Sequence, residues 1–191
     1  MTNKEGTKPF DSGKLLKDIK ELDVKNAAII DVDQITFSNE VRGYCEQNQC
    51  GKYGINWACP PGVGLLWELE AEARVYQHGV LLQKVHKLSS SFDFHGMMDG
   101  KAALEKILRT AWKLVKEKYG AVEMLVLGAG ACEICPECTF VKGEPCRQPK
   151  EALASMEAYG IDVMSLVKKY DIPYNHGPET VSYVGLVLFN I

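Results

Sequence analysis

Four cysteines lie between positions 132 and 146 at a spacing that suits an inorganic cluster. They form the pattern Cys132-x2-Cys135-x2-Cys138-x7-Cys146. Three thiolates separated by two residues can surround one face of a [4Fe-4S] cluster, and a fourth can return from a loop to the remaining iron. Bacterial ferredoxins differ, because their run has three residues before its last cysteine and a proline directly after it. The similarity therefore concerns ligand geometry, and it predicts a cluster held by these four residues.

Three further cysteines lie earlier in the chain. Cys50 follows Cys45 after four residues, and Cys59 follows after eight more, directly before Pro60-Pro61-Gly62. Proline after a ligand fixes the backbone and removes an amide donor, which shapes a loop around a buried site. Three thiolates can hold three corners of a [4Fe-4S] cluster and leave the fourth iron to a non-cysteine ligand, a substrate or water, where it acts as a Lewis acid. The seven candidate ligands are Cys45, Cys50, Cys59, Cys132, Cys135, Cys138 and Cys146.

The N-terminal residues indicate the compartment of the protein, and the compartment decides whether these thiols stay reduced. Residues 1–8 contain no apolar run, so we expect neither a secretory signal nor a lipidation site, and a cytoplasmic protein. An odd number of cysteines in a reducing compartment indicates metal binding or catalysis and not a disulfide framework. A structural zinc ion with four tetrahedral ligands is the main alternative for the second group. Redox chemistry of a C-x-x-C pair is a weaker one.

Cationic and aromatic residues accompany both groups. A [4Fe-4S] cluster with four thiolates carries net negative charge, so nearby cations can balance it and aromatic rings can exclude water. Each such residue is equally typical of ordinary loop cations and core aromatics. The candidates are Arg42, Lys52, Lys142 and Arg147 for the first role and Tyr44, Tyr53, Trp57 and Phe140 for the second.

The four histidines are weaker candidates. His78 and His86 fall in a predicted strand, whereas His95 and His176 fall in predicted loops and better suit a missing ligand or a proton donor. Acid-base chemistry is a further hypothesis for two loop carboxylates. A structural or solvated role is the more common one for all of these side chains, including the carboxylates of Asp93 and Asp99.

Strands and helices alternate along most of the chain. This alternation indicates an α/β fold, with α+β as the alternative, in which helices cover a mixed β-sheet. We expect a flexible N-terminus at 1–11 and a single domain at 12–191, with cysteine loops at 44–64 and 130–149. The patterns predict helices over 12–22, 65–73, 101–119, 151–159 and 162–170, strands over 27–31, 34–38, 75–88, 121–128 and 180–190, and a polar connection over 89–100.

Composition limits the partners. Hydrophobic residues make up 46% and charged residues 25% of 191 residues, so the chain can bury a core without metal. The net charge is −3 and no long Lys/Arg block is present, so we do not expect nucleic acid as a partner. No apolar stretch is long enough to cross a membrane. We expect a redox partner protein or a small-molecule substrate instead, and leave homodimer formation open.

Three segments together resemble a known family. They are Cys45-x4-Cys50-Gly-Lys-Tyr-Gly-x-Asn-Trp-x-Cys59-Pro-Pro, Cys132-x2-Cys135-x2-Cys138-x7-Cys146-Arg-x-Pro and Ser155-Met-Glu-Ala-x-Gly-Ile-Asp-Val163. Over residues 41–190 the chain is similar to the small prokaryotic proteins labelled predicted metal-binding and otherwise of unknown function. The resemblance implies a metal of iron-sulfur type, an anaerobic or microaerobic host, and the seven cysteines as ligands. It implies no reaction.

Three functions remain open at this stage. The leading hypothesis is one-electron transfer through one or two [4Fe-4S] clusters to a protein partner, because no P-loop or dinucleotide fingerprint accompanies the cysteines. The second is an enzyme, a lyase or a sulfur-removing one, that binds a small substrate at the iron left open by the first group. The polar connection over 89–100 would then cover the site. The third is a structural zinc protein.

Overall fold

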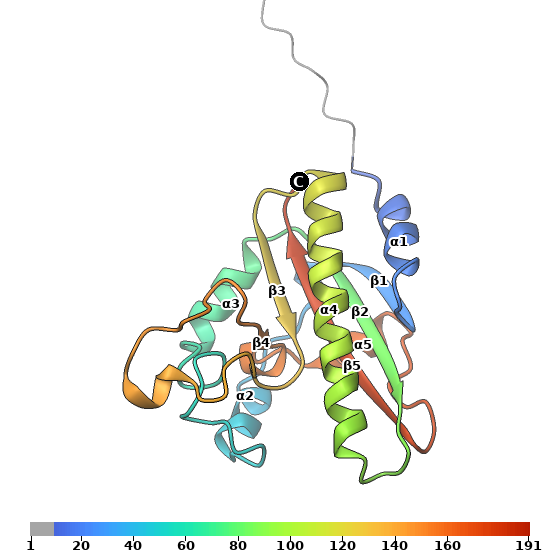
Figure 1. The fold of residues 1–191 in the computed structure, drawn as a ribbon. Coiled ribbons are helices and arrows are strands. Elements are labelled where there is room, and N and C mark those ends of the chain that lie inside the picture. The colour runs from blue at the N-terminus through green and yellow to red at the C-terminus, as the bar shows by residue number, and fades with distance from the viewer. Residues whose placement is uncertain (1–9) are drawn as a thin grey trace, which may run out of the picture.

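The computed structural model describes residues 10–191, which build a five-stranded sheet (Figure 1). Neighbouring strands are antiparallel except β3 and β4, which are parallel. The mixed α/β fold predicted from the alternation of strands and helices is therefore confirmed. The strand order across the sheet is β1 (Asn26–Asp31), β2 (His78–Lys87), β5 (Thr180–Phe189), β3 (Met124–Gly128) and β4 (Ala154–Ser155).

The central pair of the sheet, β2 and β5, sets the two halves of the core. The strands pair over ten residues, from His78 opposite Phe189 to Lys87 opposite Thr180. Because side chains alternate along a strand, Val80 points into one apolar cluster and Leu81 into the other. Both faces of the sheet are consequently covered.

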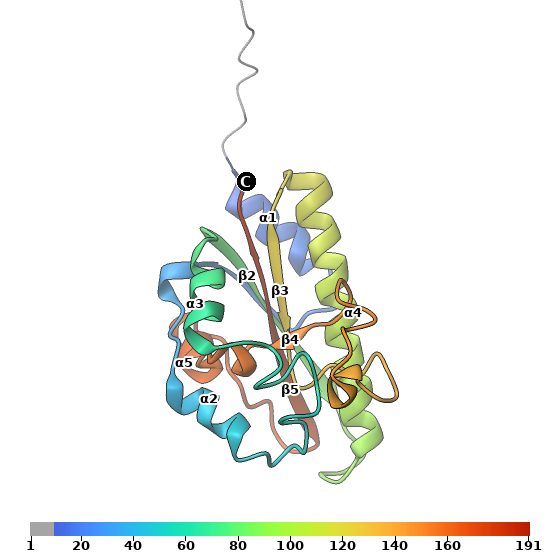
Figure 2. The same cartoon turned by 90° about the vertical axis from the view of Figure 1, so that its left-hand side faces the viewer.

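Helices cover the two faces in separate layers, as the edge-on view of Figure 2 shows. On one face, α1 (Ser12–Lys20) and α4 (Phe94–Tyr119) bury apolar residues such as Leu108 against the sheet. On the other face, α3 (Leu66–Arg74) and α5 (Val163–Lys169) do the same. The sheet edge formed by β3 and β4 faces the two cysteine-bearing segments (Figures 1 and 2).

Helix α4 is longer than predicted. It begins at Phe94 and not near position 101, because the Asp93 side chain accepts a hydrogen bond from the Gly96 N–H at 2.8 Å and caps the helix. Much of the predicted polar connection over 89–100 is therefore helical. At the other end the helix stops at Gly120, whose φ of 74° suits glycine.

Two predicted elements are wrong. Residues 34–38 form a single bridge, Phe37 to Ile161, after a short 3-10 helix, η1 (Val32–Gln34), and not a strand. The helix predicted over 151–159 is replaced by β4 and a 3-10 turn, η3 (Glu157–Tyr159). In both cases strand pairing decides the outcome: residues 34–38 find no partner beyond one bridge, whereas residues 154–155 pair with β3.

The expected flexible segment 1–11 falls almost entirely outside the described residues. Of its two described residues, Phe10 packs its ring 5.7 Å from that of Phe189, and Asp11 caps α1 by accepting from the Lys14 N–H at 2.9 Å. Asp11 is therefore the cap of this helix. Within residues 10–191, no helix combines the length and apolar character that a membrane span requires.

Candidate metal centre

The second cysteine group lies on an irregular loop between β3 and β4. All seven cysteines of the chain carry free thiols, and the four of this loop are partly exposed. One short helix, η2 (Thr139–Lys142), interrupts the loop, and the buried Thr139 hydroxyl donates to the Pro145 carbonyl at 2.9 Å. This bond closes the turn between the third and fourth cysteines. One small pocket is lined by the four thiol-bearing residues Cys132, Cys135, Cys138 and Cys146 together with the segment 56–58.

The first cysteine group begins on a helix and not in a loop. Cys45 lies in the last turn of α2 (Asn39–Glu46), which Ser38 caps by accepting from the N–H groups of Glu40 and Val41. The predicted loop 44–64 therefore starts only after α2. Cys50 is exposed, whereas Cys59 is 9% exposed and lies against the body of the protein.

Three thiols, those of Cys45, Cys59 and Cys132, have a pKa above that of free cysteine because they are partly or fully buried. Burial raises the pKa of Cys59 to about 12, and the negative charges that Cys50, Cys45 and Cys132 would carry as thiolates add to this. Burial also raises the pKa of Cys45, which the Arg42 guanidinium opposes. Ligation of metal by these thiols would therefore release protons.

Two residues between Cys50 and Cys59 tie the loops together. The Asn56 side chain, 6% exposed, donates to the Cys132 carbonyl at 2.8 Å and accepts from the Ala58 N–H at 2.9 Å. The Trp57 backbone N–H donates to the Cys138 sulfur at 3.4 Å. Figures 1 and 2 both show the two loops side by side at the end of β3. Sequence reasoning missed Asn56, and its only signal was a polar amide between two cysteines.

Aromatic packing and a glycine fix how closely the loops approach. The Trp57 ring meets the Phe140 ring edge-on at 4.9 Å, and its indole N–H donates to the Glu144 carbonyl at 3.0 Å. A Cβ on Gly62 would lie 2.7 Å from the Asn56 carbonyl oxygen and 2.8 Å from the Phe140 ring, so only glycine fits there. Trp57 and Phe140, the two rings expected to exclude water, are both partly buried. Tyr44, in contrast, is 57% exposed.

The expected counter-charges divide into one buried cation and three cations that are exposed or partly exposed. Arg42, 8% exposed, donates through its guanidinium to the carbonyls of Ala158 and, at 2.7 Å, Gly64. Burial lowers its pKa, and the nearby Cys45 opposes that shift. The exposed cations pair with groups of the second loop: Lys52 lies 3.9 Å from Glu133, Lys142 lies 2.8 Å from Glu137, and Arg147 donates to the Glu137 carbonyl at 3.5 Å.

The histidines lie apart from the pocket that the four cysteines line. His95 belongs to the first turn of α4 and not to a loop, and the His176 ring nitrogen lies 3.2 Å from the Gln83 side chain. His78 stacks on Phe10 at 4.9 Å, and His86 packs against Gly100.

The carboxylate expected to do acid-base chemistry, Asp93, is a helix cap. Hydrogen bonds from the Ser89 and Gly96 backbones lower its pKa to about 2, so it is ionised at neutral pH. Asp99 lies within α4. The structure does not bring either carboxylate into the cysteine pocket.

The donor set suits an iron-sulfur cluster, because soft thiols gather around one pocket and the Trp57 N–H is directed at the Cys138 sulfur. Among residues 10–191, no three Cys, His, Asp or Glu side chains lie close enough to surround a single metal ion. The four thiols thus line one pocket, but they do not converge on the position of a single ion.

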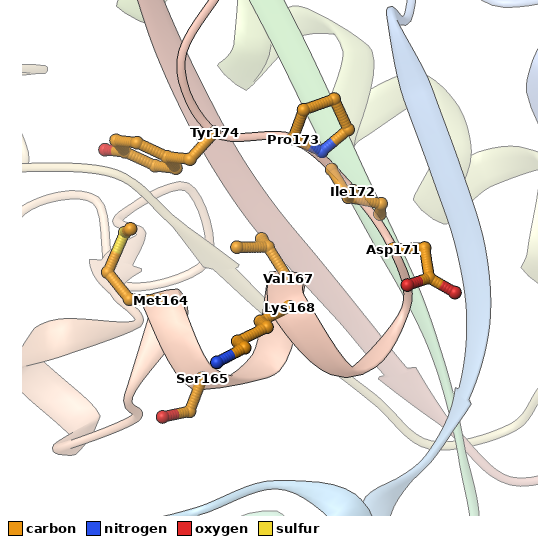
Figure 3. Close-up of a pocket in the computed structure, with 8 residues that line it drawn as sticks. All are labelled: Met164, Ser165, Val167, Lys168, Asp171, Ile172, Pro173 and Tyr174. Atoms are coloured by element: carbon orange, nitrogen blue, oxygen red, sulfur yellow. The ribbon is translucent and has the colours of Figure 1, made fainter.

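A larger hollow lies elsewhere, between α5 and residues 171–174. Figure 3 shows Met164, Val167, Ile172 and Tyr174 around it. The hollow has a volume of about 650 Å³. Its lining is mainly apolar and includes no cysteine or histidine. The cysteine chemistry of the chain is therefore separate from this hollow.

Comparison with known proteins places the chain in a family. The family model described as predicted metal-binding protein (DUF2284) matches residues 28–189, a span that includes both cysteine groups and most of the sheet. No curated protein and no solved structure matches the chain. Since the match covers most of its length, the chain belongs to this predicted metal-binding family.

Proposed function

We propose that this protein binds a [4Fe-4S] cluster through Cys132, Cys135, Cys138 and Cys146 and passes single electrons to a protein partner. One observation carries the proposal: all four thiols line the same pocket. Their sequence spacing suits the corners of a cubane, and three of them come from one seven-residue segment. Bound there, the cluster would supply a reversible one-electron couple.

The surrounding residues hold and tune the thiolates in this proposal. The Trp57 N–H donates to the Cys138 sulfur, and such hydrogen bonds raise the reduction potential of a cluster because they stabilise its more negative state. Asn56 fixes the backbone at Cys132 through the 2.8 Å bond to its carbonyl. Lys142 and Arg147 place positive charge on the same loop. Without the segment of the first cysteine group, the second loop would lack its contacts with Trp57 and Asn56.

The first group extends the proposal to a second cluster. Cys45, Cys50 and Cys59 could hold three irons of such a cluster. Asn56 and Trp57, which come shortly before Cys59, contact Cys132 and Cys138 of the other group. Two clusters held at these positions would adjoin, which favours the passage of an electron from one to the other.

A second candidate function is an enzyme that uses an open iron as a Lewis acid. It is favoured by the first group having three cysteines, and by an apolar cavity of about 420 Å³ that reaches Ala58, the neighbour of Cys59, although the one cysteine in its lining is Cys146 of the second group. This cavity has room for a small substrate. Spectral changes at the first group on addition of small hydroxy acids or thiols, lost in Cys59→Ser but kept in Cys135→Ser, would support it.

Anaerobic purification tests the main proposal. Iron, acid-labile sulfide and zinc are measured, followed by visible absorption and electron paramagnetic resonance before and after dithionite. We expect iron and sulfide in equal amounts, a brown colour and a signal that appears on reduction. Zinc without sulfide would instead establish a structural zinc protein, and a full cluster that cannot be reduced would exclude electron transfer.

A further inference from the structure

A basic stripe runs along the exposed side of α4. Lys106, Arg109, Lys113 and Lys116 recur every three or four residues, so they share one side of the helix. Lys150, from the second cysteine loop, joins this stripe at a common cavity. This concentration of positive charge stands out because the chain as a whole carries a net charge of −3. An acidic partner would be attracted to this side of the molecule.

The stripe borders a groove of about 660 Å³ between α4, β3 and residues 150–153. Apolar side chains, Met124, Val126 and Leu153 among them, form part of its wall. The Lys116 ammonium lies 4.8 Å from the centre of the Trp112 ring, which holds its charge at the groove. The groove thus combines an apolar surface with cations, as protein interfaces do.

One wall of the groove is an incompletely paired strand. β4 pairs only with Leu127 and Gly128 of β3, so within residues 10–191 the outer edge of Met124–Val126 has no strand partner. Such an edge can accept an added extended segment through main-chain hydrogen bonds. The groove therefore suits an extended peptide segment better than a compact ion.

The groove adjoins the cysteine pocket. Ala152 lines both, and Lys150 follows Cys146 by four residues. Arg109 anchors the connecting segment to α4, because it forms an ion pair with the Glu151 carboxylate and donates to the Glu151 carbonyl at 2.7 Å. A partner in the groove would consequently touch the segment that carries the fourth cysteine.

We propose that this groove is the docking site of an acidic electron-carrier protein, whose acidic segment lies along the edge of β3 and meets Lys113, Lys116 and Lys150. The inference rests on the proposed electron transfer. Complexes of redox proteins are small and steered by charge, which suits this modest groove. Nucleic acid fits less well, because its phosphates need a longer run of cations and offer nothing to an apolar wall or a strand edge.

Electron delivery from reduced flavodoxin, a small acidic one-electron carrier, tests the proposal. Full-length protein with K113E and K116E is compared by stopped flow with a variant carrying K17E and K20E. Both pairs change the net charge equally, but Lys17 and Lys20 lie in α1, which packs with β1 at the opposite edge of the sheet. We expect the groove variant to lower the second-order rate about tenfold at low salt. The α1 variant should lower it much less, and reduction by dithionite should be unchanged in both.

Three outcomes would overturn the docking site. One is an equal loss in both variants, which would reflect net charge alone. Another is a rate that does not fall with rising salt. The third is tight binding of an oligonucleotide that depends on Lys113 and Lys116, which would assign the groove to nucleic acid. If dithionite itself produces no reducible signal, the proposed function fails separately, and calorimetric titration of flavodoxin into the two variants still decides whether the groove binds it.

Discussion

The two cysteine groups offer the same chemistry on different supports. The first begins on α2 and ends at the buried Cys59, beside a buried Arg42 that donates to two backbone carbonyls. The second lies on an irregular loop with partly exposed thiols, and it contacts the first through Asn56 and Trp57. The positions of the thiols in the first group are therefore set by α2 and by buried residues. The positions of those in the second group depend on contacts with the first. A change in the first should be felt in both, and a change in the second only locally.

Replacing one cysteine in each group should have the largest effect on metal content. Cys135→Ser should remove about four irons per chain, because a cubane lacking a thiolate corner is poorly held. Cys59→Ser should also lower the free energy of unfolding of the metal-free protein, since a more polar hydroxyl replaces a buried thiol. Iron analysis and urea unfolding under anaerobic conditions measure both. Unchanged iron in the Cys135→Ser protein would remove this residue from the ligand set.

The second largest effect is expected from replacing the buried cation, Arg42. Arg42→Met should lower the free energy of unfolding by about 2–4 kcal/mol, because it leaves the buried carbonyl of Ala158 and the partly buried carbonyl of Gly64 without their charged donor. Arg147→Met is the control, as that exposed side chain makes one long bond at 3.5 Å, and its change should stay within about 0.5 kcal/mol. Equal losses in the two variants would contradict the contrast drawn between the two groups.

Tight packing between the loops gives a smaller effect. Gly62→Ala places a Cβ 2.7 Å from the Asn56 carbonyl and should cost about 1–3 kcal/mol. Gly43→Ala, on α2, is matched to it: its Cβ meets no atom within 4 Å, and alanine favours the helix by about 0.5–1 kcal/mol. Hydrogen exchange should report faster opening of residues 129–153 in the first variant alone. Faster exchange of this loop in both would show that the close approach at Gly62 does not hold it.

The smallest effect should come from Asp93, which lies outside both groups. Its pKa is lowered from 3.8 to about 2 by the bonds that cap α4, so the cap stabilises the fold above pH 3.8 and is lost as the pH falls through about 2. Asp93→Asn should reduce the loss of stability between pH 3.8 and about 2, which thermal unfolding across this pH range measures. Iron content at neutral pH should not change. A loss of iron would mean that the cap of α4 supports the metal centre after all.

Prediction from sequence worked best where the evidence was local. Helix α4 and strand β5 followed from apolar periodicity, and only the start of α4 was misplaced, because the Asp93 cap looked like an ordinary loop carboxylate. It failed where distant pairing decided the outcome, as in β4, whose two residues are strand only because β3 lies beside them. The basic stripe of α4 was missed for a related reason: no block of cations exists in the linear sequence, and only helical spacing gathers Lys106, Lys113 and Lys116 on one side.

The sequence by itself determined the kind of ligand and its spacing, because a C-x2-C-x2-C run needs only a few bonds of chain to bring soft donors to one cofactor. It also determined the alternation of strands and helices. Only the tertiary structure decided that residues near 57 and near 138 touch, that Asn56 joins the two groups, and that a cationic groove opens beside the fourth cysteine. Contacts between segments about eighty residues apart depend on how the sheet is ordered and packed, and no local pattern encodes them.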